Sequence, residues 1–353
     1  MKKVISVLLL ACMLLTLTAC GSQPAAPATD PTAEATEAPA AETAEAEYKL
    51  GMGVSVSLDS SDTNKAQVDA TVATVVTDSE GKIVLCRIDC AQNKMDVTGG
   101  AVDTAKTFLT KRELGDDYNM VKYSDATLEW YQQAENFEAY CVGKTADEIA
   151  GIETKVNEEG YNVAVDETLY ASCSISIEDF IGAVVKACSD EKGQTFKASG
   201  ELKLGLAAIT TAAESTPATD TDPAAVKMYT DFGATVVGAD GKILAAITDS
   251  IQPVVNADKE GKIVDSTFKG TKRELGSDYG MVAYGNAIAE WDAQAQAFAN
   301  YTVGKTADEV RAIETTQNDH GYSVTADETL YASCTMQITG MMAVLAQAAD
   351  YAR

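Results

Sequence analysis

Apolar side chains alternate with polar or small ones over residues 50–58 and again over 68–76. A period of two is typical of β strands. A third apolar run, 83–88, follows the second across the turn residues 78–81, and the equivalent turn later in the chain contains Asp240-Gly241, a strong hairpin signal. These patterns predict an antiparallel sheet built from hairpins.

After this predicted sheet, the apolar side chains have the spacing of one face of a helix. Trp130, Ala134 and Phe137 fall at i, i+4 and i+7, which predicts a helix that Ser124 or Asp125 caps. The segments TADE at 145–148 and 306–309 have the spacing of capping boxes and predict short helices. An apolar stripe over 177–188 predicts a further helix. The expected fold class is therefore α+β.

The chain contains an internal duplication. Residues 110–187, which include TKRELG, VGKTADE and DETLYASC, recur without a gap as residues 271–348, with about half of the positions identical. Weaker matches extend each copy upstream through the strands. We therefore expect two homologous domains, 48–192 and 198–353, each an antiparallel hairpin region followed by several short helices, with a joint at 193–200.

The first residues predict export. Lys2 and Lys3 precede an apolar run too short to span a bilayer, which is typical of a signal peptide, here 1–19. The run ends in Leu-Thr-Ala-Cys and resembles the lipobox of bacterial lipoproteins. That resemblance implies an acylated Cys20 that anchors the protein to the cell membrane on its extracytoplasmic side. The alternative is an ordinary signal peptide with an unrelated cysteine. The Ala/Pro/Thr/Glu-rich residues 20–47 are expected to form a disordered tether.

Charge and composition exclude several functions. Among 353 residues, 53 are acidic and 27 basic, so the formal charge is −26 and a nucleic-acid partner is not expected. The single histidine, His320, argues against histidine-based metal sites and catalytic triads, and we expect it on the surface. The cysteines after Cys20 are expected to be buried and inert.

Few residues suggest binding chemistry. The two Lys-Arg pairs could hold a phosphate or a carboxylate, or could simply balance nearby acidic residues; they are Lys111 with Arg112 and Lys272 with Arg273. Trp130 and Trp291 could stack on a planar ligand, although each begins the apolar stripe of a helix and is better explained by core packing. The repeated DETLYASC segment could form an anion site at the start of the next helix, or only cap that helix.

That segment also resembles the end of the FMN-binding domain found in bacterial envelope lipoproteins and electron-transfer complexes. The resemblance implies a flavin phosphate near Ser172 and Ser174, or Ser333 and Thr335, with covalent attachment through Ser174 or Thr335. The TKRELG and VGKTADE segments resemble lipoproteins of Gram-positive bacteria.

Two functions follow as hypotheses. The first is a flavin-dependent extracytoplasmic electron carrier that exchanges electrons with a membrane redox partner. The second is a non-enzymatic ligand-binding or structural surface lipoprotein without the cofactor. A hydrolase is disfavoured because the sequence offers no paired nucleophile and base, so an electron carrier or a binding module is expected rather than an enzyme.

Overall fold

The computed structural model describes residues 45–353. The predicted signal peptide, the predicted lipid anchor at Cys20 and most of the predicted tether lie outside the described residues. The last part of the expected tether is ordered, because strand β1 (Ala46–Ser57) begins before residue 48. None of the helices within 45–353 has the length and apolar character needed to cross a bilayer.

The first half builds a four-stranded antiparallel sheet in the order β3-β2-β1-β6. Strand β1 pairs with β2 (Lys65–Asp78), and β2 pairs with β3 (Ile83–Asp96) across the tight turn expected from the sequence. Strand β6 (Gln194–Ala198) returns after the helices to pair with β1. The predicted antiparallel hairpins are thus confirmed.

The second half repeats the three-stranded core of this sheet in the order β10-β9-β7, formed by β7 (Leu202–Thr211), β9 (Tyr229–Gly238) and β10 (Ile243–Ile251). A separate antiparallel sheet, β12-β11-β8, consists of β8 (Ala224–Val226), β11 (Val254–Ala257) and β12 (Ile263–Thr267). The loop at 212–223, before β8, is mostly exposed.

The helical parts of the two halves correspond element by element. After the 3-10 turn Thr98–Gly100, the first half has α1 (Lys111–Leu114), the 3-10 turn Gly115–Tyr118, α2 (Met120–Tyr123), α3 (Trp130–Cys141), α4 (Ala146–Ala150), β4 (Thr154–Val156), β5 (Asn162–Ala164), α5 (Glu167–Ser172) and α6 (Glu178–Cys188). The second half has α7 (Lys272–Leu275), the 3-10 turn Gly276–Tyr279, α8 (Met281–Gly285), α9 (Trp291–Thr302), α10 (Ala307–Arg311), β13 (Thr315–Gln317), β14 (Ser323–Thr325), α11 (Glu328–Tyr331) and α12 (Thr339–Asp350). The mixture of helices and antiparallel sheets confirms the α+β class.

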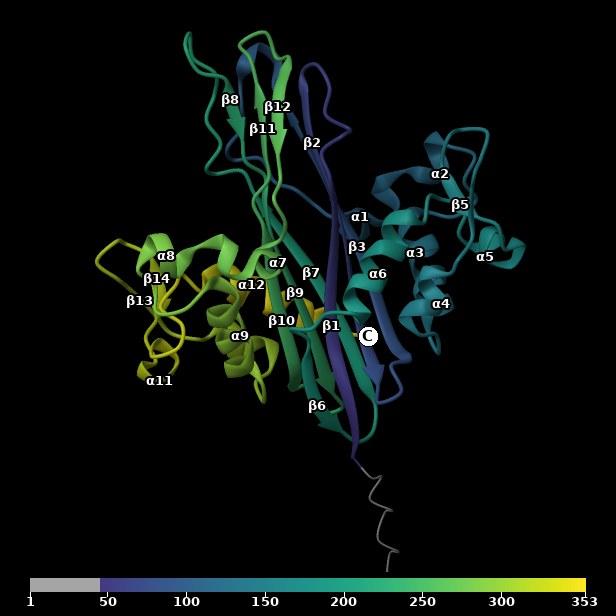
Figure 1. Ribbon diagram of the computed structural model, residues 1–353, viewed down its shortest axis with the longest axis vertical. Coiled ribbons are helices and arrows are strands. Elements are labelled where there is room, and N and C mark those ends of the chain that lie inside the picture. The colour runs from purple at the N-terminus through teal and green to yellow at the C-terminus, as the bar shows by residue number, and fades with distance from the viewer. Residues whose placement is uncertain (1–44) are drawn as a thin grey trace, which may run out of the picture. The chain divides into compact units, whose positions relative to one another are not determined.

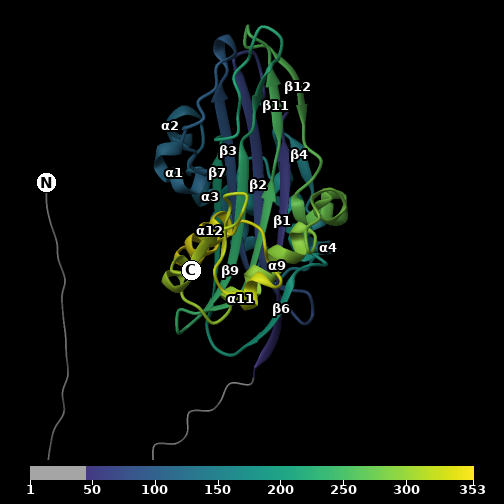
Figure 2. The ribbon, with the colours of Figure 1, turned by 90° about the vertical axis from the view of Figure 1, so that its left-hand side faces the viewer.

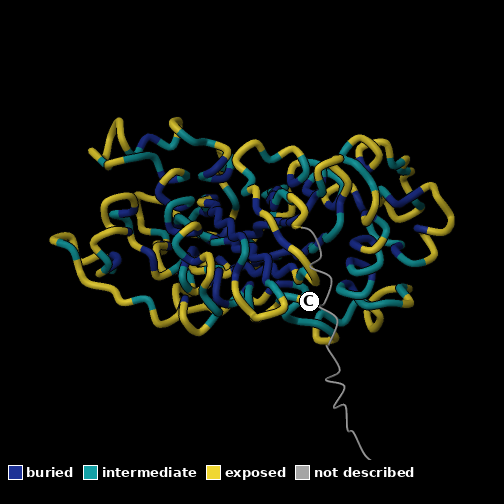
Figure 3. Tube along the Cα trace, turned by 90° about the horizontal axis from the view of Figure 1, so that it is seen from below, coloured by how far each residue is buried: buried dark blue, intermediate teal, exposed yellow. Residues whose placement is uncertain are grey.

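The two main sheets pack face to face, with one group of helices on each outer side (Figure 1, Figure 2). Leu50 and Val72 from the first sheet share one hydrophobic cluster with Phe232 and Val236 from the second. Figure 3 shows the buried residues concentrated in this middle region. The outer faces are covered too: Val75 of β2 packs under the first group of helices. Each sheet is therefore buried on both faces.

The expected division into two domains does not correspond to a gap in the packing. The described residues, 45–353, belong to one compact unit. Most of the expected joint, 193–200, is strand β6, which is hydrogen-bonded into the first sheet. Independent folding of 48–192 and 198–353 stays a prediction, and the core that the two halves share is an argument against it.

One local expectation about a helix start needs correction. Helix α3 begins at Trp130 rather than next to Ser124 or Asp125, because the Glu129 backbone amide donates to Gln132 Oε1 at 2.9 Å and the helix starts there. The capping boxes at Thr145 and Thr306 are present as predicted, and they open α4 and α10.

Candidate functional site

Helix α1 is fixed against the first sheet by a buried carboxylate. Asp89 of β3 accepts the backbone amides of Cys90 at 2.7 Å and Arg112 at 3.2 Å. Thr110 caps the helix, and its hydroxyl accepts from the Glu113 amide at 3.1 Å. The second half repeats this arrangement with Asp249, Arg273 and Thr271. The lysine that opens each helix is therefore held in the same place.

These two lysines, Lys111 and Lys272, each lie over two aromatic rings. Lys111 Nζ lies 5.1 Å from the ring centre of Tyr118 and 5.3 Å from that of Trp130. Lys272 Nζ lies 5.1 Å from the rings of Tyr279 and Trp291. Neither ammonium forms an ion pair with another part of the chain between residues 45 and 353. Cation–π contacts of this kind are worth about 0.5–2 kcal/mol.

Burial affects the pKa values of the two lysines differently. Burial lowers the pKa of Lys111, but its neighbours Cys90 and Tyr118, and to a smaller extent Asp69, together raise it more, so the ammonium stays charged at neutral pH. Burial lowers the pKa of Lys272, which Asp231 and Asp249 only partly offset.

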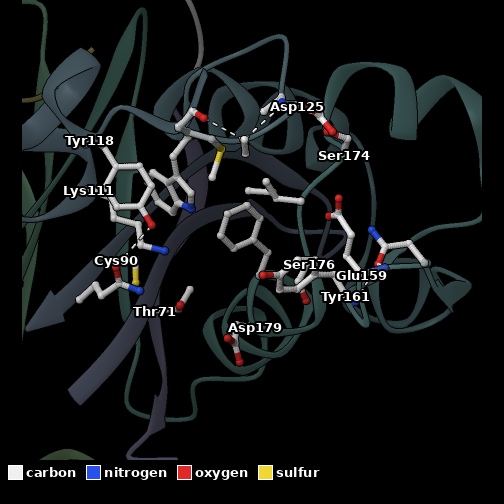
Figure 4. A pocket seen from close by; sticks show the side chains of 18 of the residues that line it. Thr71, Cys90, Lys111, Tyr118, Asp125, Glu159, Tyr161, Ser174, Ser176 and Asp179 are labelled. Atoms are coloured by element: carbon white, nitrogen blue, oxygen red, sulfur yellow. Dashed lines mark hydrogen bonds between the residues drawn. The ribbon is translucent and has the colours of Figure 1, made fainter. Parts of the chain in front are cut away.

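A cavity of about 620 Å³ opens beside Lys111 (Figure 4). Its walls come from β2 and β3, α1 and α3, the turn between β4 and β5, and the start of α6. Aromatic side chains provide much of the surface; these are Tyr118, Trp130, Tyr161, Tyr170 and Phe180. A volume of this size is typical of sites for small organic molecules.

The charges in the cavity are separated. Figure 4 shows Lys111 and Tyr118 on one side, Glu159 and Tyr161 on the opposite side, and Asp179 between them. Asp125 and Glu158 also contribute to the lining. Burial, with help from nearby acidic groups, raises the pKa of Asp179, and Lys111 counteracts that shift. The cavity thus offers one cation and several carboxylates to a ligand.

Of the predicted serines and threonine, only Ser174 lines this cavity. Its amide and hydroxyl lie 2.8 Å and 3.3 Å from Gln133 Oε1, to which both donate. Thr335 has the same arrangement with Gln294, at 2.9 Å and 3.3 Å. Ser172 and its counterpart Ser333 instead donate to helix carbonyls three residues back, each at 3.1 Å.

The expected anion site at the start of α6 is not formed by this segment. Asp166 caps a separate short helix, α5, which ends at Ser172, and α6 begins only at Glu178. The first turn of α6 carries Glu178 and Asp179, whose charges oppose a bound anion.

Both arginines of the predicted cationic pairs form ion pairs within the fold. Arg112 forms ion pairs with Glu138 at 2.6 Å and Glu135 at 3.0 Å. Arg273 forms an ion pair with Asp190 at 2.9 Å and so ties α7 to the end of the first half. The structure therefore brings Lys111 and Ser174 to one cavity and excludes Arg112 from it.

The tryptophans and cysteines behave largely as expected. Trp130 and Trp291 are buried in helix–sheet cores, although Trp130 also forms part of the cavity wall. The six described cysteines are free, and five of them are buried. Burial raises the pKa of the Cys90 thiol at the cavity, so it is protonated at neutral pH. His320 is exposed in the turn between β13 and β14, as predicted.

Sequence reasoning missed the tyrosines and Asp179. Tyr161 and Tyr170 are substantially exposed, and so are Tyr322 and Tyr331 at the equivalent positions of the second half. An exposed tyrosine that recurs in both copies has no role in the core, and this recurrence could have identified the rim of the cavity. Asp179 gave no such signal, because its counterpart is Gly340.

Comparisons of the chain with family models, with curated proteins and with solved structures found no match.

Proposed function

We propose that the protein is a non-enzymatic, extracytoplasmic binding lipoprotein whose first half binds a small organic ligand in the cavity beside Lys111. The observation that carries this proposal is the Lys111 ammonium, which has no ion-pair partner among residues 45–353 and lies over two aromatic rings at the wall of a cavity of about 620 Å³. Its charge remains available to a ligand, whereas Arg112 is neutralised by the fold.

The cavity lining supports binding rather than catalysis. It contains no histidine, and its one cysteine, Cys90, is a protonated thiol. A thiol with a raised pKa is a poor nucleophile. The membrane attachment in this proposal rests on the sequence around Cys20.

The residues around Ser174 do not fit the phosphate of FMN. The Ser174 amide and hydroxyl already donate to Gln133, and a dianion at the start of α6 would face Glu178 and Asp179. Among the residues that line the cavity, Lys111 is the one cation that could compensate such a charge, since Arg112 is paired elsewhere. We therefore favour the module without cofactor over the flavin-dependent electron carrier.

Thermal unfolding with a ligand panel tests the proposal. The panel contains amino acids, dipeptides, monosaccharides, linear amines and FMN, each at millimolar concentration. A ligand present at 100 times its Kd stabilises the folded state by about 2.7 kcal/mol and raises the Tm. At least one member should raise the Tm of the mature protein, and Ser176→Trp, which places an indole in the cavity, should abolish that increase.

Gln337→Trp is the matched control, because Gln337 is the exposed counterpart of Ser176 in the second half and lies outside this cavity. It should respond to ligand like the unmodified protein. A panel without any effect, or an equal response from Ser176→Trp, would overturn the proposal. If FMN alone binds and Lys111→Met weakens it, the electron carrier becomes the better explanation.

A further inference from the structure

The second half keeps both charges of the site but takes the carboxylate from a different element. In the first half, Asp179 on α6 lines the cavity beside Lys111. Its counterpart on α12 is Gly340, and the Asp231 carboxylate of β9 occupies the space that a Cβ on Gly340 would take. Asp231 in turn influences Lys272. The Asp231 carboxylate in the second half therefore lies at the position that corresponds to the Cβ of Asp179 in the first half.

The carboxylate is on different elements in the two halves, which favours a role in binding over a role in local structure. A carboxylate needed only to cap a helix or pair a strand would stay on that element. The carboxylate at this position is on helix α6 in the first half and on strand β9 in the second, and the lysine lies over two rings in both halves. What the two halves share is the combination of opposite charges beside an aromatic wall.

From this combination we infer that the ligand is zwitterionic: a short peptide with a free amino group and a free carboxylate. This inference rests on the binding function proposed above. The ligand carboxylate would lie at Lys111, and its ammonium at Asp179 and the acidic side that includes Glu159 (Figure 4). An apolar side chain would pack against Trp130 and Phe180, two aromatic residues that line the cavity.

Other ligand classes leave part of the site uncompensated. A purely cationic amine would be attracted by the carboxylates but would leave Lys111 without an opposite charge, and a dianion would be repelled by Asp179 and Glu159. A neutral sugar would leave the partly buried ammonium desolvated without an opposite charge, which is unfavourable. Only a ligand with both charges satisfies both sides of the cavity.

Isothermal titration with three related peptides tests the inference. They are Phe-Ala, Phe-Ala amide, which lacks the carboxylate, and N-acetyl-Phe-Ala, which lacks the ammonium. Charge-assisted hydrogen bonds of this kind change affinity by about tenfold or more. Phe-Ala should bind at least about tenfold more tightly than either derivative.

Two variants then assign each charge. In Lys111→Met, which keeps the length of the side chain, Phe-Ala and its amide should bind equally, because the carboxylate has lost its partner. In Asp179→Asn, the loss of affinity caused by N-acetylation should become smaller, because the ligand ammonium has lost one of its partners. Lys82→Met and Asp147→Asn, both at exposed positions, are the charge-matched controls and should retain both penalties.

The outcomes are distinguishable from failure of the proposed function. If the amide and the N-acetyl form bind as tightly as Phe-Ala, the zwitterionic ligand is refuted while a binding site remains. If the penalty for amidation persists in Lys111→Met, Lys111 is refuted as the partner of the ligand carboxylate. If another member of the panel binds but Phe-Ala does not, the ligand class is likewise wrong. Binding of no panel member refutes the site itself. A melting curve without ligand confirms that each variant is folded.

Discussion

Asp249 should make the protein less stable as the pH rises through the mildly acidic range. Its carboxylate lies in β10 with about 4% of the residue exposed, and Oδ1 accepts the amides of Ser250 at 2.8 Å and Arg273 at 3.0 Å. Burial raises its pKa from 3.8 to about 6, although Arg273 and these hydrogen bonds oppose the shift. Asp249→Asn keeps an Oδ1 that can accept both amides and removes the charge.

The direction and the size of this change in stability follow from the linkage between proton binding and folding. Because the folded protein holds this proton more tightly than the unfolded chain, the contribution of Asp249 to stability is greatest below about pH 4 and falls until the pH exceeds about 6. A shift of about two pKa units corresponds to about 3 kcal/mol. The unfolding free energy of Asp249→Asn, relative to the unmodified protein, should therefore rise by about 3 kcal/mol between about pH 4 and about pH 8.

Urea unfolding of both proteins at these two pH values measures the difference. Other buried carboxylates titrate equally in both proteins and cancel in the comparison. The control is Asp319→Asn, which changes an exposed aspartate in the turn between β13 and β14. Its unfolding free energy relative to the unmodified protein should change by less than about 0.5 kcal/mol between the two pH values. If the relative unfolding free energy of Asp249→Asn changes as little with pH as that of the control, the raised pKa of Asp249 is refuted.

Three further predictions concern the core, the packing of helix on sheet, and the anchor. Glu138→Ala removes the ion-pair partner of the largely buried Arg87 and the shorter of the two ion pairs of Arg112, and it should lower the unfolding free energy by about 3–5 kcal/mol in urea. Glu135→Ala, with 42% of its side chain exposed, should cost under about 1 kcal/mol; equal losses would contradict this. Gly51→Ala puts a Cβ into a backbone carbonyl of α6 and should lower the Tm clearly, unlike Gly182→Ala, whose Cβ meets only a serine hydroxyl at 3.2 Å; an unchanged Tm for Gly51→Ala would argue against this packing. Metabolic labelling with a fatty acid should mark the protein and fail for Cys20→Ala, and label that persists on the variant would disprove the anchor.

Local features of the fold could be predicted because each depends on neighbours in the sequence. Alternation gave the strands, and the spacing from Thr145 to Glu148 gave the start of α4. The packing of the sheets could not be read in this way, because both faces of β2 are apolar: Val72 faces the shared core and Val75 faces the helices. Nor could β6, whose pairing with β1 joins segments about 150 residues apart.

The candidate site was predicted only in part, because it also depends on contacts between segments that are far apart in the sequence. Lys111 and Ser174 were identified, and they do line one cavity. Arg112 looked equivalent to Lys111 in the sequence, but its direction on α1 takes it to Glu138, a contact that no local pattern indicates. Asp179 followed a predicted helix start and was not distinguished from an ordinary residue of the first helical turn.

The core shared by the two sheets has a consequence for how the protein arose. A single-copy ancestor with the first sheet would have exposed Leu50 and Val72 to water, because the second sheet covers them here. Two such chains could have buried this face by associating as a symmetric homodimer. Gene duplication and fusion would then have made the association intramolecular, so that assembly no longer depended on protein concentration. Fusion would also have allowed the two copies to diverge, as the difference between Asp179 and its counterpart Gly340 illustrates.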